Sequence, residues 1–379
     1  MTAPPLDPAA LDDALQPFGS STMLPAEAYT SPAVFAWEQQ HFFAASWVCL
    51  GAARDLRPIG VAQVTQKAVT VGGVPVLLVW ADDDVPAAFA NTCRHRGHEL
   101  LAAGAEAGKR AIVCPYHAWS YALDGSLIAA PGLQDVASFD PDAHGLVRLP
   151  VEAWHGWLFI NADARGGSFA EHLGSLDGLV APYAPEGLVR LASHDYVVET
   201  NWKVATENYH ECYHCPLIHP ELCQVSPPAS GHNYDLPGAW VGGCMDLRDG
   251  ADTMSHDGRS AGHPLEGVDP RRVLYLGLLP NMLLSLHPDY VMTHRLEPLS
   301  PGRTRIECSW YFPDEGIDPS YAVDFWDRTN RQDWAACESV QRGISSPHFR
   351  PGPLAPNEDA VHQFVTMVAR GYLGARLAG

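Results

Sequence analysis

The sequence has few positive charges, no long apolar run and no basic leader. It holds 24 lysines and arginines against 44 aspartates and glutamates, a formal net charge of −20. Nucleic acid and anionic membrane surfaces bind clusters of basic residues, so we expect neither as a partner. The most apolar stretch, residues 273–286, is interrupted by Pro280 and Asn281. It is shorter than the roughly 20 residues of a membrane span, and we therefore expect no membrane segment.

The cysteines do not fit a disulfide-rich secreted protein. The nine cysteines are odd in number and spread over 379 residues, and the first 20 residues contain acids and prolines where a secretory signal would have a basic and then an apolar segment. This pattern does not indicate a disulfide framework. We expect reduced thiols and a cytoplasmic location, with metal ligation by some of the cysteines left open.

What remains is the composition of a folded, turn-rich protein. Charged residues make up 18% of the chain, below the usual ~25%, and apolar residues 46%, enough to bury a sizeable core. Glycine and proline number 33 and 32, which favours many turns and short strands over coiled-coil or fibrous structure. The length predicts two or three domains.

Hydrophobic patterning predicts an α+β chain with a β-rich first half. Strands are predicted at 61–71 and 74–80, joined by a Gly72-Gly73 turn, then at 87–91, 111–113, 118–123 and 154–160. Further on, strands are predicted at 191–200, 274–298 and 303–312, and helices at 206–215, 321–343 and 358–373. We divide the chain into an N-terminal lead (1–46), an all-β domain (47–155) and an α+β domain (156–379), and we expect the lead to pack on the α+β domain.

The all-β domain contains two short loops that each carry one cysteine and one histidine. They are Cys93-Arg-His95, followed by Gly97, and Cys114-Pro-Tyr-His117. Two thiolates and two imidazoles can complete a closed metal site. A zinc finger usually keeps its cysteines in one pair and its histidines in another, whereas here each pair mixes the two. Mixed pairs favour two sulfide-bridged irons with thiolates on one and imidazoles on the other, with zinc as the alternative.

A second group of ligands lies in residues 201–220, where His210, Glu211, His214 and His219 fall close together. On the predicted helix 206–215, Glu211 and His214 would share a face, and Pro216 would end that helix. A mononuclear metal site needs converging imidazoles plus one carboxylate, and it leaves positions open for oxygen. The alternative is a solvated polar helix, which explains His210 but explains less well the neighbouring pairs Cys212-Tyr213 and Cys215-Pro216, which we expect to be buried.

These motifs resemble those of the Rieske non-heme iron oxygenases, alpha subunit. Cys93-Arg-His-Arg-Gly97 and Cys114-Pro-Tyr-His-Ala-Trp119 are similar to the two loops that hold a Rieske 2Fe-2S cluster. The resemblance implies that Cys93 and Cys114 bind one iron and that His95 and His117 bind the other. Ala118 stands where many relatives have glycine, a difference that we expect to matter little.

The catalytic motif resembles the same family, and within it the branch that acts on quaternary ammonium compounds. The resemblance implies mononuclear Fe(II) on His214, His219 and a downstream carboxylate, for which Asp333 in the sequence around residues 332–343 is the best match. Asp324 and Asp327 on the same predicted helix are expected to be solvated. Glu211 matches the acidic residue that bridges the two metal centres across a subunit boundary.

The resemblance further implies a helix-grip, START-like catalytic domain and a partnership with other proteins. The implied reaction is hydroxylation or oxidative N-demethylation of a small substrate, with a betaine-like quaternary ammonium compound as the leading candidate. It uses O2 and electrons from an NAD(P)H-dependent flavin/iron–sulfur reductase. The implied assembly is a homotrimer. Aromatic ring hydroxylation is the alternative activity, and a pure electron carrier or a zinc-stabilised structural protein are the alternatives from other classes. We expect the substrate pocket between residues 231 and 312, with Tyr234, Trp240, Tyr275 and Tyr290 as aromatic candidates.

Overall fold

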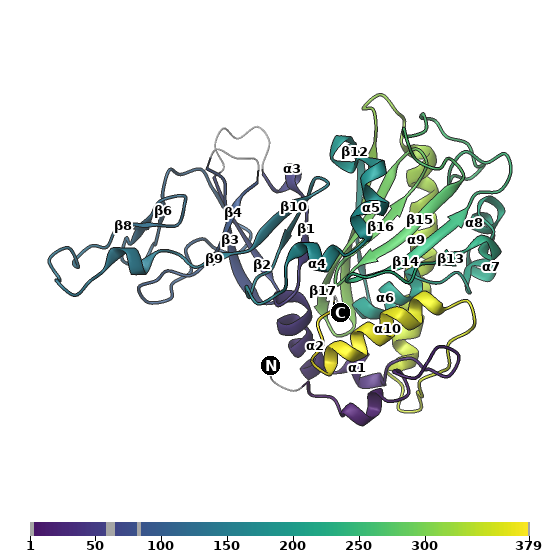
Figure 1. The fold of residues 1–379 in the computed structure, drawn as a ribbon, viewed down its shortest axis with the longest axis horizontal. Coiled ribbons are helices and arrows are strands. Elements are labelled where there is room, and N and C mark those ends of the chain that lie inside the picture. Colours follow the sequence, from purple (N-terminus) through teal and green to yellow (C-terminus); the bar gives the residue numbers. More distant parts are fainter. Residues whose placement is uncertain (1–3, 58–64, 82–84, 378–379) are drawn as a thin grey trace. The chain divides into compact units, whose positions relative to one another are not determined.

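The computed structural model describes residues 4–57, 65–81 and 85–377. The chain divides into two compact units, one of residues 38–169 and one of residues 1–37 with 170–379 (Figure 1). The family expectation of an all-β part and an α+β part matches their contents. Our domain boundaries at 46/47 and 155/156 remain predictions.

The unit of residues 38–169 consists of three antiparallel sheets with the strand orders β5-β2-β3-β4-β9, β6-β7-β8 and β1-β11-β10. Its elements are β1 (Val48–Ala52), α3 (Ala53–Leu56), β2 (Gln66–Val71), β3 (Val74–Val79), β4 (Ala87–Ala90), β5 (Glu106–Ala107), β6 (Ile112–Val113), β7 (Ser120–Tyr121), β8 (Leu127–Ala129), β9 (Arg148–Leu149), β10 (Val151–Trp154) and β11 (Trp157–Ile160). Gly72 and Gly73 both have positive φ, as the predicted tight turn requires. Residues 61–64 of the first predicted strand lie outside the described residues.

The other unit is built on a seven-stranded antiparallel sheet of order β12-β18-β17-β16-β15-β14-β13. The strands are β12 (Val189–Val198), β13 (His232–Asn233), β14 (Trp240–Asp246), β15 (Arg272–Leu278), β16 (Met282–Leu286), β17 (Val291–Ser300) and β18 (Arg303–Phe312). The single strand predicted at 274–298 is wrong: it is three strands, because the chain reverses at Leu279-Pro280-Asn281 and again before Val291. The turn between β17 and β18 lies where it was predicted.

Helices border this sheet. They are α1 (Ala26–Thr30), α2 (Pro32–Glu38), α4 (Phe169–Leu173), α5 (Leu176–Val180), α6 (Trp202–Tyr209), α7 (Cys215–Ile218), α8 (Pro220–Val225), α9 (Ser320–Ile344) and α10 (Asp359–Tyr372). The long α9 packs against α6 and β12, and α6 also contacts β17 (Figure 1). None of the helices formed by the described residues has both the length and the apolar character needed to cross a bilayer.

Candidate metal centres and cavity

The two Cys/His loops of the β unit have the same backbone design. In each loop the residue four positions after the cysteine has positive φ, +73° at Gly97 and +58° at Ala118. Its N–H donates to the cysteine carbonyl, at 3.0 Å in the first loop and 3.1 Å in the second. The second loop lies between β6 and β7, and the first follows β4. The two loops therefore form equivalent tight turns, although one of them has alanine in the left-handed position.

The loops bring the four predicted ligands into two chemically different layers. Cys93 and Cys114 are 3% and 2% exposed and belong to an apolar cluster with Trp119. The rings of His95 and His117 lie farther out, with centroids 4.7 Å apart. Desolvation and the nearby His95 lower the pKa of His117, which favours the neutral imidazole that binds metal. Buried thiols beneath paired imidazoles are the donor set that a 2Fe-2S cluster of mixed ligation needs.

Tyr121 is a residue of this centre that the sequence analysis missed. Its hydroxyl oxygen accepts a hydrogen bond from the backbone N–H of Arg94 at 3.0 Å and lies 3.2 Å from Sγ of Cys93. Since that oxygen already accepts from Arg94, its own hydrogen is available to the sulfur. Hydrogen bonds to cluster sulfurs tune the reduction potential of iron–sulfur proteins. The one sequence signal for this tyrosine is its place in the predicted strand 118–123, where the structure has the two-residue strand β7.

In the other unit, the predicted helix 206–215 is wrong. Helix α6 ends at Tyr209, a non-helical turn follows, and α7 begins at Cys215. The Glu211 carboxylate accepts hydrogen bonds from the backbone N–H groups of Tyr213 and His214, which competes with helical bonding to backbone carbonyls. Pro216 lies in the first turn of α7, where its missing N–H costs nothing, so it begins a helix and does not end one.

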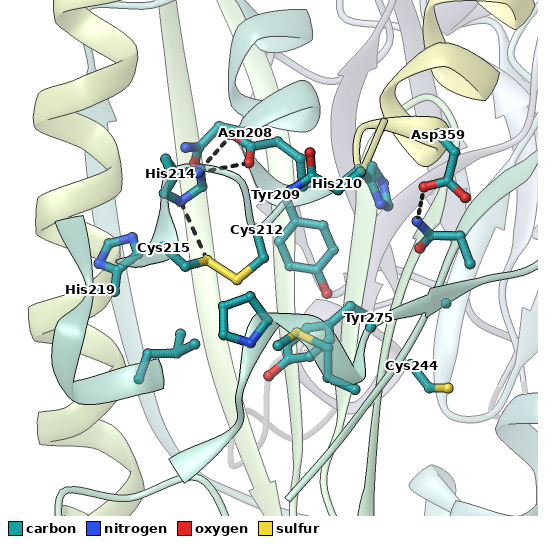
Figure 2. A pocket seen from close by; sticks show the side chains of 18 of the residues that line it. Asn208, Tyr209, His210, Cys212, His214, Cys215, His219, Cys244, Tyr275 and Asp359 are labelled. Carbon is teal, nitrogen blue, oxygen red and sulfur yellow. Dashed lines mark hydrogen bonds and ion pairs between the residues drawn. A yellow bond between two sulfur atoms is a disulfide. The ribbon is translucent and has the colours of Figure 1, made fainter. Parts of the chain in front are cut away.

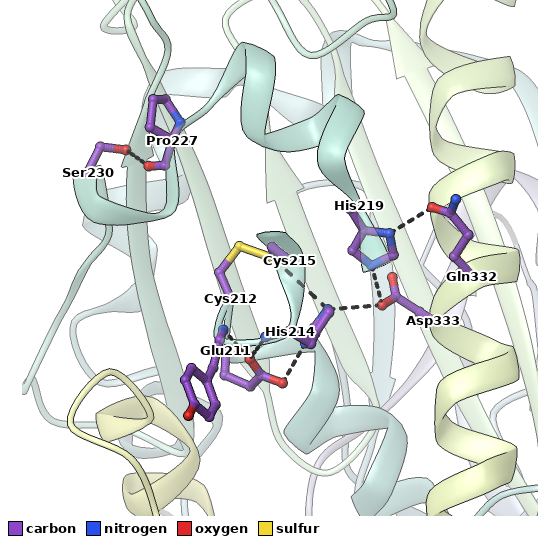
Figure 3. Close-up of a disulfide and its surroundings, with 10 residues drawn as sticks. Glu211, Cys212, His214, Cys215, His219, Pro227, Ser230, Gln332 and Asp333 are labelled. Atoms are coloured by element: carbon purple, nitrogen blue, oxygen red, sulfur yellow. Dashed lines mark hydrogen bonds and ion pairs between the residues drawn. A yellow bond between two sulfur atoms is a disulfide. The ribbon is translucent and has the colours of Figure 1, made fainter. Parts of the chain in front are cut away.

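This local structure places the two histidines at either end of a single helical turn. His214 directly precedes α7 and His219 directly follows it, with ring centroids 5.1 Å apart. From α9, Asp333 reaches both rings: its Oδ1 lies 3.2 Å from Nε2 of His214 and 2.7 Å from Nε2 of His219 (Figure 3). Among the described residues, His214, His219 and Asp333 form the only group of three or more potential ligands whose donor atoms lie within 4.8 Å of one another.

Each histidine is oriented through its other ring nitrogen. Nδ1 of His214 donates to Oε1 of Glu211 at 2.5 Å, and Nδ1 of His219 donates to Oε1 of Gln332 at 2.8 Å (Figure 3). Both Nε2 atoms are therefore directed at the Asp333 carboxylate, in the arrangement that metal-ligating histidines usually have. Burial lowers the pKa of His214, but hydrogen bonds to Asp333 and Glu211 outweigh it and raise that pKa to about 10. The carboxylates of Asp333 and Glu211 thus favour a positive charge at this site.

The other acidic residues of α9 do not contact His214 or His219. Asp324 is exposed, as expected. Asp327 is not simply solvated, because it accepts hydrogen bonds from Tyr196 at 2.6 Å and Arg331 at 2.7 Å. Glu338 accepts from the backbone N–H of Glu199. Among these acids only Asp333 contacts the two histidines.

The expectations for the residues around the histidines were only partly correct. His210 is 5% exposed, so it does not belong to a solvated polar helix. Cys215 is buried, whereas Tyr213 is 62% exposed. The expectation of reduced thiols is wrong for Cys212 and Cys215, which form a disulfide across the turn that carries His214 (Figure 3). The other seven cysteines, all within the described residues, form no disulfide.

A cavity of about 550 Å³ opens beside the histidines (Figure 2). Its wall includes the aromatic residues Tyr209, Tyr275 and Trp326, with 6.2 Å between the first two ring centroids and 6.3 Å between the last two. Of the four aromatic residues predicted for the pocket, only Tyr275 lines it. Tyr209 and Trp326 were missed because both come from helices, outside the strands where the pocket was expected.

Comparison with known proteins identifies the family. Residues 46–140 match the model of the Rieske [2Fe-2S] domain, and residues 185–374 match that of the ring hydroxylating alpha subunit (catalytic domain). The chain belongs to the Rieske non-heme iron oxygenases. Members of this family are oxidoreductases whose alpha subunit contains a Rieske 2Fe-2S cluster and a mononuclear iron, and which use O2 and a reductase partner on small molecules.

Several relatives among the Rieske oxygenases are similar over most of their length. The glycine betaine monooxygenase oxygenase subunit of Chromohalobacter salexigens is 32% identical over 88% of this chain and 81% of its own. The carnitine monooxygenase oxygenase subunit of Escherichia coli K12 is 38% identical over 86% and 85%. A crystal structure of the quaternary ammonium Rieske monooxygenase CntA with L-carnitine has a TM-score of 0.71 at 26% identity, covering 97% of this chain and 99% of its own.

The aromatic branch of the family is similar in fold alone. Naphthalene 1,2-dioxygenase from Rhodococcus has a TM-score of 0.75 at 16% identity and covers 97% of this chain and 98% of its own. The fold class and the enzyme class expected from the sequence are therefore confirmed, and the electron carrier and zinc-protein alternatives are excluded.

Proposed function

We propose that this Rieske oxygenase oxidises an N-methyl group of a small quaternary ammonium compound. One observation carries the proposal: the convergent His214, His219 and Asp333 border a cavity whose wall includes the neighbouring aromatic rings of Tyr209, Tyr275 and Trp326. Aromatic faces attract cations that cannot form hydrogen bonds, such as trimethylammonium. The relatives that act on glycine betaine and carnitine support the same substrate class.

The proposed roles of the ligands follow from their chemistry. Cys93, Cys114, His95 and His117 would hold the 2Fe-2S cluster, which supplies single electrons, and His214, His219 and Asp333 would hold the iron that activates O2. The aromatic wall binds the cation and keeps the methyl group next to the triad. Glu211 and Gln332 fix the histidine rings. One atom of O2 enters a methyl C–H bond and the other leaves as water, a step that consumes two electrons from the reductase and two protons. The hydroxymethyl product then loses formaldehyde and a proton to leave a tertiary amine.

The source and route of the electrons are part of the proposal. We expect an NAD(P)H-dependent flavin/iron–sulfur reductase as the donor, a cytoplasmic location where NAD(P)H is available, and a homotrimer. A solved relative is described in terms of inter-subunit electron transfer, which supports a route from the cluster of one subunit to the iron of the next. Glu211 is our candidate for the residue at that boundary, because it contacts His214 and its side chain is 13% exposed.

The experiment is a product assay with the purified oxygenase, O2 and a reductase. A panel of quaternary ammonium compounds and aromatic acids is supplied, and formaldehyde, tertiary amines and hydroxylated aromatics are measured. We expect formaldehyde and tertiary amine in equal amounts from at least one ammonium compound, and neither from the Asp333→Ala variant. Hydroxylated aromatics without formaldehyde would show that the proposal is wrong.

A further inference from the structure

The cavity beside the histidines is lined by carboxylates, and the basic side chains that line it within the described residues are all histidines. Glu211, Asp333 and Asp359 line it, and none of the lysines and arginines in the described part of the chain does. Asp333 would be neutralised by the iron, and the Glu211 carboxylate is engaged by His214 and two backbone N–H groups. Asp359 is therefore the lining carboxylate whose negative charge can attract a cationic substrate.

Asp359 lies at the end of the cavity away from the metal ligands. Figure 2 shows it across the pocket from His219, with Tyr209 and Tyr275 between them in this view. One of its carboxylate oxygens accepts a hydrogen bond from the side-chain amide of Asn233 at 2.5 Å. It belongs to the first turn of the 14-residue helix α10, so it occupies the place where the helix dipole would otherwise attract an anion.

The ring of Tyr275 also belongs to the cavity wall. The hydroxyl of Tyr275 is buried in the wall and has no hydrogen-bond partner within the described residues. Burial raises the pKa of this tyrosine, so it stays neutral. A substrate that reaches from the histidines to Asp359 therefore passes aromatic faces before it meets a carboxylate.

Together these features distinguish between substrates of the proposed class. Glycine betaine and carnitine are zwitterions whose carboxylate would lie beside Asp359 here, at a cost from like charge. We infer that the substrate is a net cation, an N-methyl ammonium compound whose far end carries a hydroxyl or amine donor, and that Asp359 accepts the hydrogen bond from that donor. This inference rests on the proposed function and adds to it the specificity-determining residue.

His232 is the residue that could reverse this preference. It lines the same cavity and is exposed, and a protonated imidazole could bind a carboxylate. The test must therefore separate Asp359 from His232, and substrate affinity from turnover.

The experiment compares choline with glycine betaine, which are similar in size but differ in the far group. Binding to the holoenzyme is measured by calorimetry in oxygen-free buffer, and turnover by product analysis. The variants are Asp359→Asn, which keeps the size of the side chain, and His232→Gln. Asp235→Asn serves as the control, because it makes the same change at an exposed aspartate that does not line the cavity.

We expect wild-type enzyme to bind choline about tenfold or more tightly than glycine betaine. Asp359→Asn should weaken choline binding by about tenfold to a hundredfold, the effect of losing a charge-assisted hydrogen bond, and should narrow or reverse the preference. Tighter binding of glycine betaine by the wild type, lost in His232→Gln, would overturn the inference, as would equal effects of Asp359→Asn and the control. If no N-methyl ammonium compound is oxidised at all, the proposed function fails. If only zwitterions are oxidised, this inference alone fails.

Discussion

Replacement of Glu211 by glutamine tests how the histidine turn is held. In the wild type, one carboxylate oxygen accepts from Nδ1 of His214 at 2.5 Å and the other accepts from the backbone N–H groups of Tyr213 and His214. Glutamine has only one acceptor oxygen, and its NH2 group would face a donor on the other side. The variant therefore loses one of these interactions and the charge that favours the bound metal ion.

The magnitude follows from the role of such partners in metal sites. Loss of a group that orients a ligating histidine typically lowers metal affinity ten- to a hundredfold, which corresponds to about 1.4 to 2.8 kcal/mol. We expect this loss for Glu211→Gln, and a similar loss for Gln332→Leu, which removes the acceptor for His219. The 2Fe-2S spectrum should not change in either variant, because both replaced residues belong to the other unit.

The assay is competition for Fe(II) with a coloured chelator, using protein whose cluster is intact. Glu315→Gln is the matched control, since Glu315 is exposed on a loop outside the cavity. Iron affinity equal to that of the control would refute the positioning role of Glu211. The rate at which the cluster is reoxidised in a single turnover reports separately on its proposed part in electron transfer.

Three further predictions concern the loops and the protonation of the site. Ala118→Gly should raise the stability of the β unit by about 0.5–1 kcal/mol and Gly97→Ala should lower it by a similar amount, because both positions have left-handed φ. Thermal unfolding followed by the cluster absorbance should show melting temperatures that shift in opposite directions, and shifts of the same sign would contradict the equivalence of the two loops. Reduction of the Cys212–Cys215 disulfide should remove about 2 kcal/mol of chain constraint from the turn that carries His214. A reductant should therefore lower the iron content of the wild type but not that of Cys212→Ser, and an equal loss of iron in both proteins would contradict a role of the disulfide in holding this turn. Since the pKa of His214 is raised to about 10 in the metal-free protein, iron must displace a proton. The affinity for Fe(II) should therefore rise about tenfold per pH unit between neutral pH and that pKa, and an affinity that does not change with pH in a chelator titration would contradict this.

Much of the site could be read from the sequence because its ligands are grouped on short segments. The two Cys/His loops and the His214–His219 spacing are local patterns, and the structure brings each pair together. Asp333 is distant in sequence, yet it follows the buried face of α9, where Trp326, Thr329 and Cys337 recur at helical spacing. Asp324 falls on the opposite, exposed face.

The failures have physical causes that a sequence pattern does not display. The turn after α6 depends on a side chain, Glu211, that captures backbone N–H groups, and local periodicity cannot reveal that competition. The disulfide depends on how this turn folds. Ala118 was expected to matter little, but its positive φ becomes visible only once the loop closes on the cysteine carbonyl. The cavity wall combines α6, β15 and α9, a tertiary juxtaposition of segments distant in the chain.

Iron analysis of the wild type beside Asp333→Ala tests the central claim most directly. Our account predicts about three irons per chain in the wild type, from the cluster and one mononuclear site, and about two in the variant, with the cluster spectrum and acid-labile sulfide unchanged. Asp324→Ala, from the exposed face of the same helix, should keep all of its iron. Equal iron in wild type and Asp333→Ala would contradict the assignment of the His214, His219 and Asp333 triad as the mononuclear iron site.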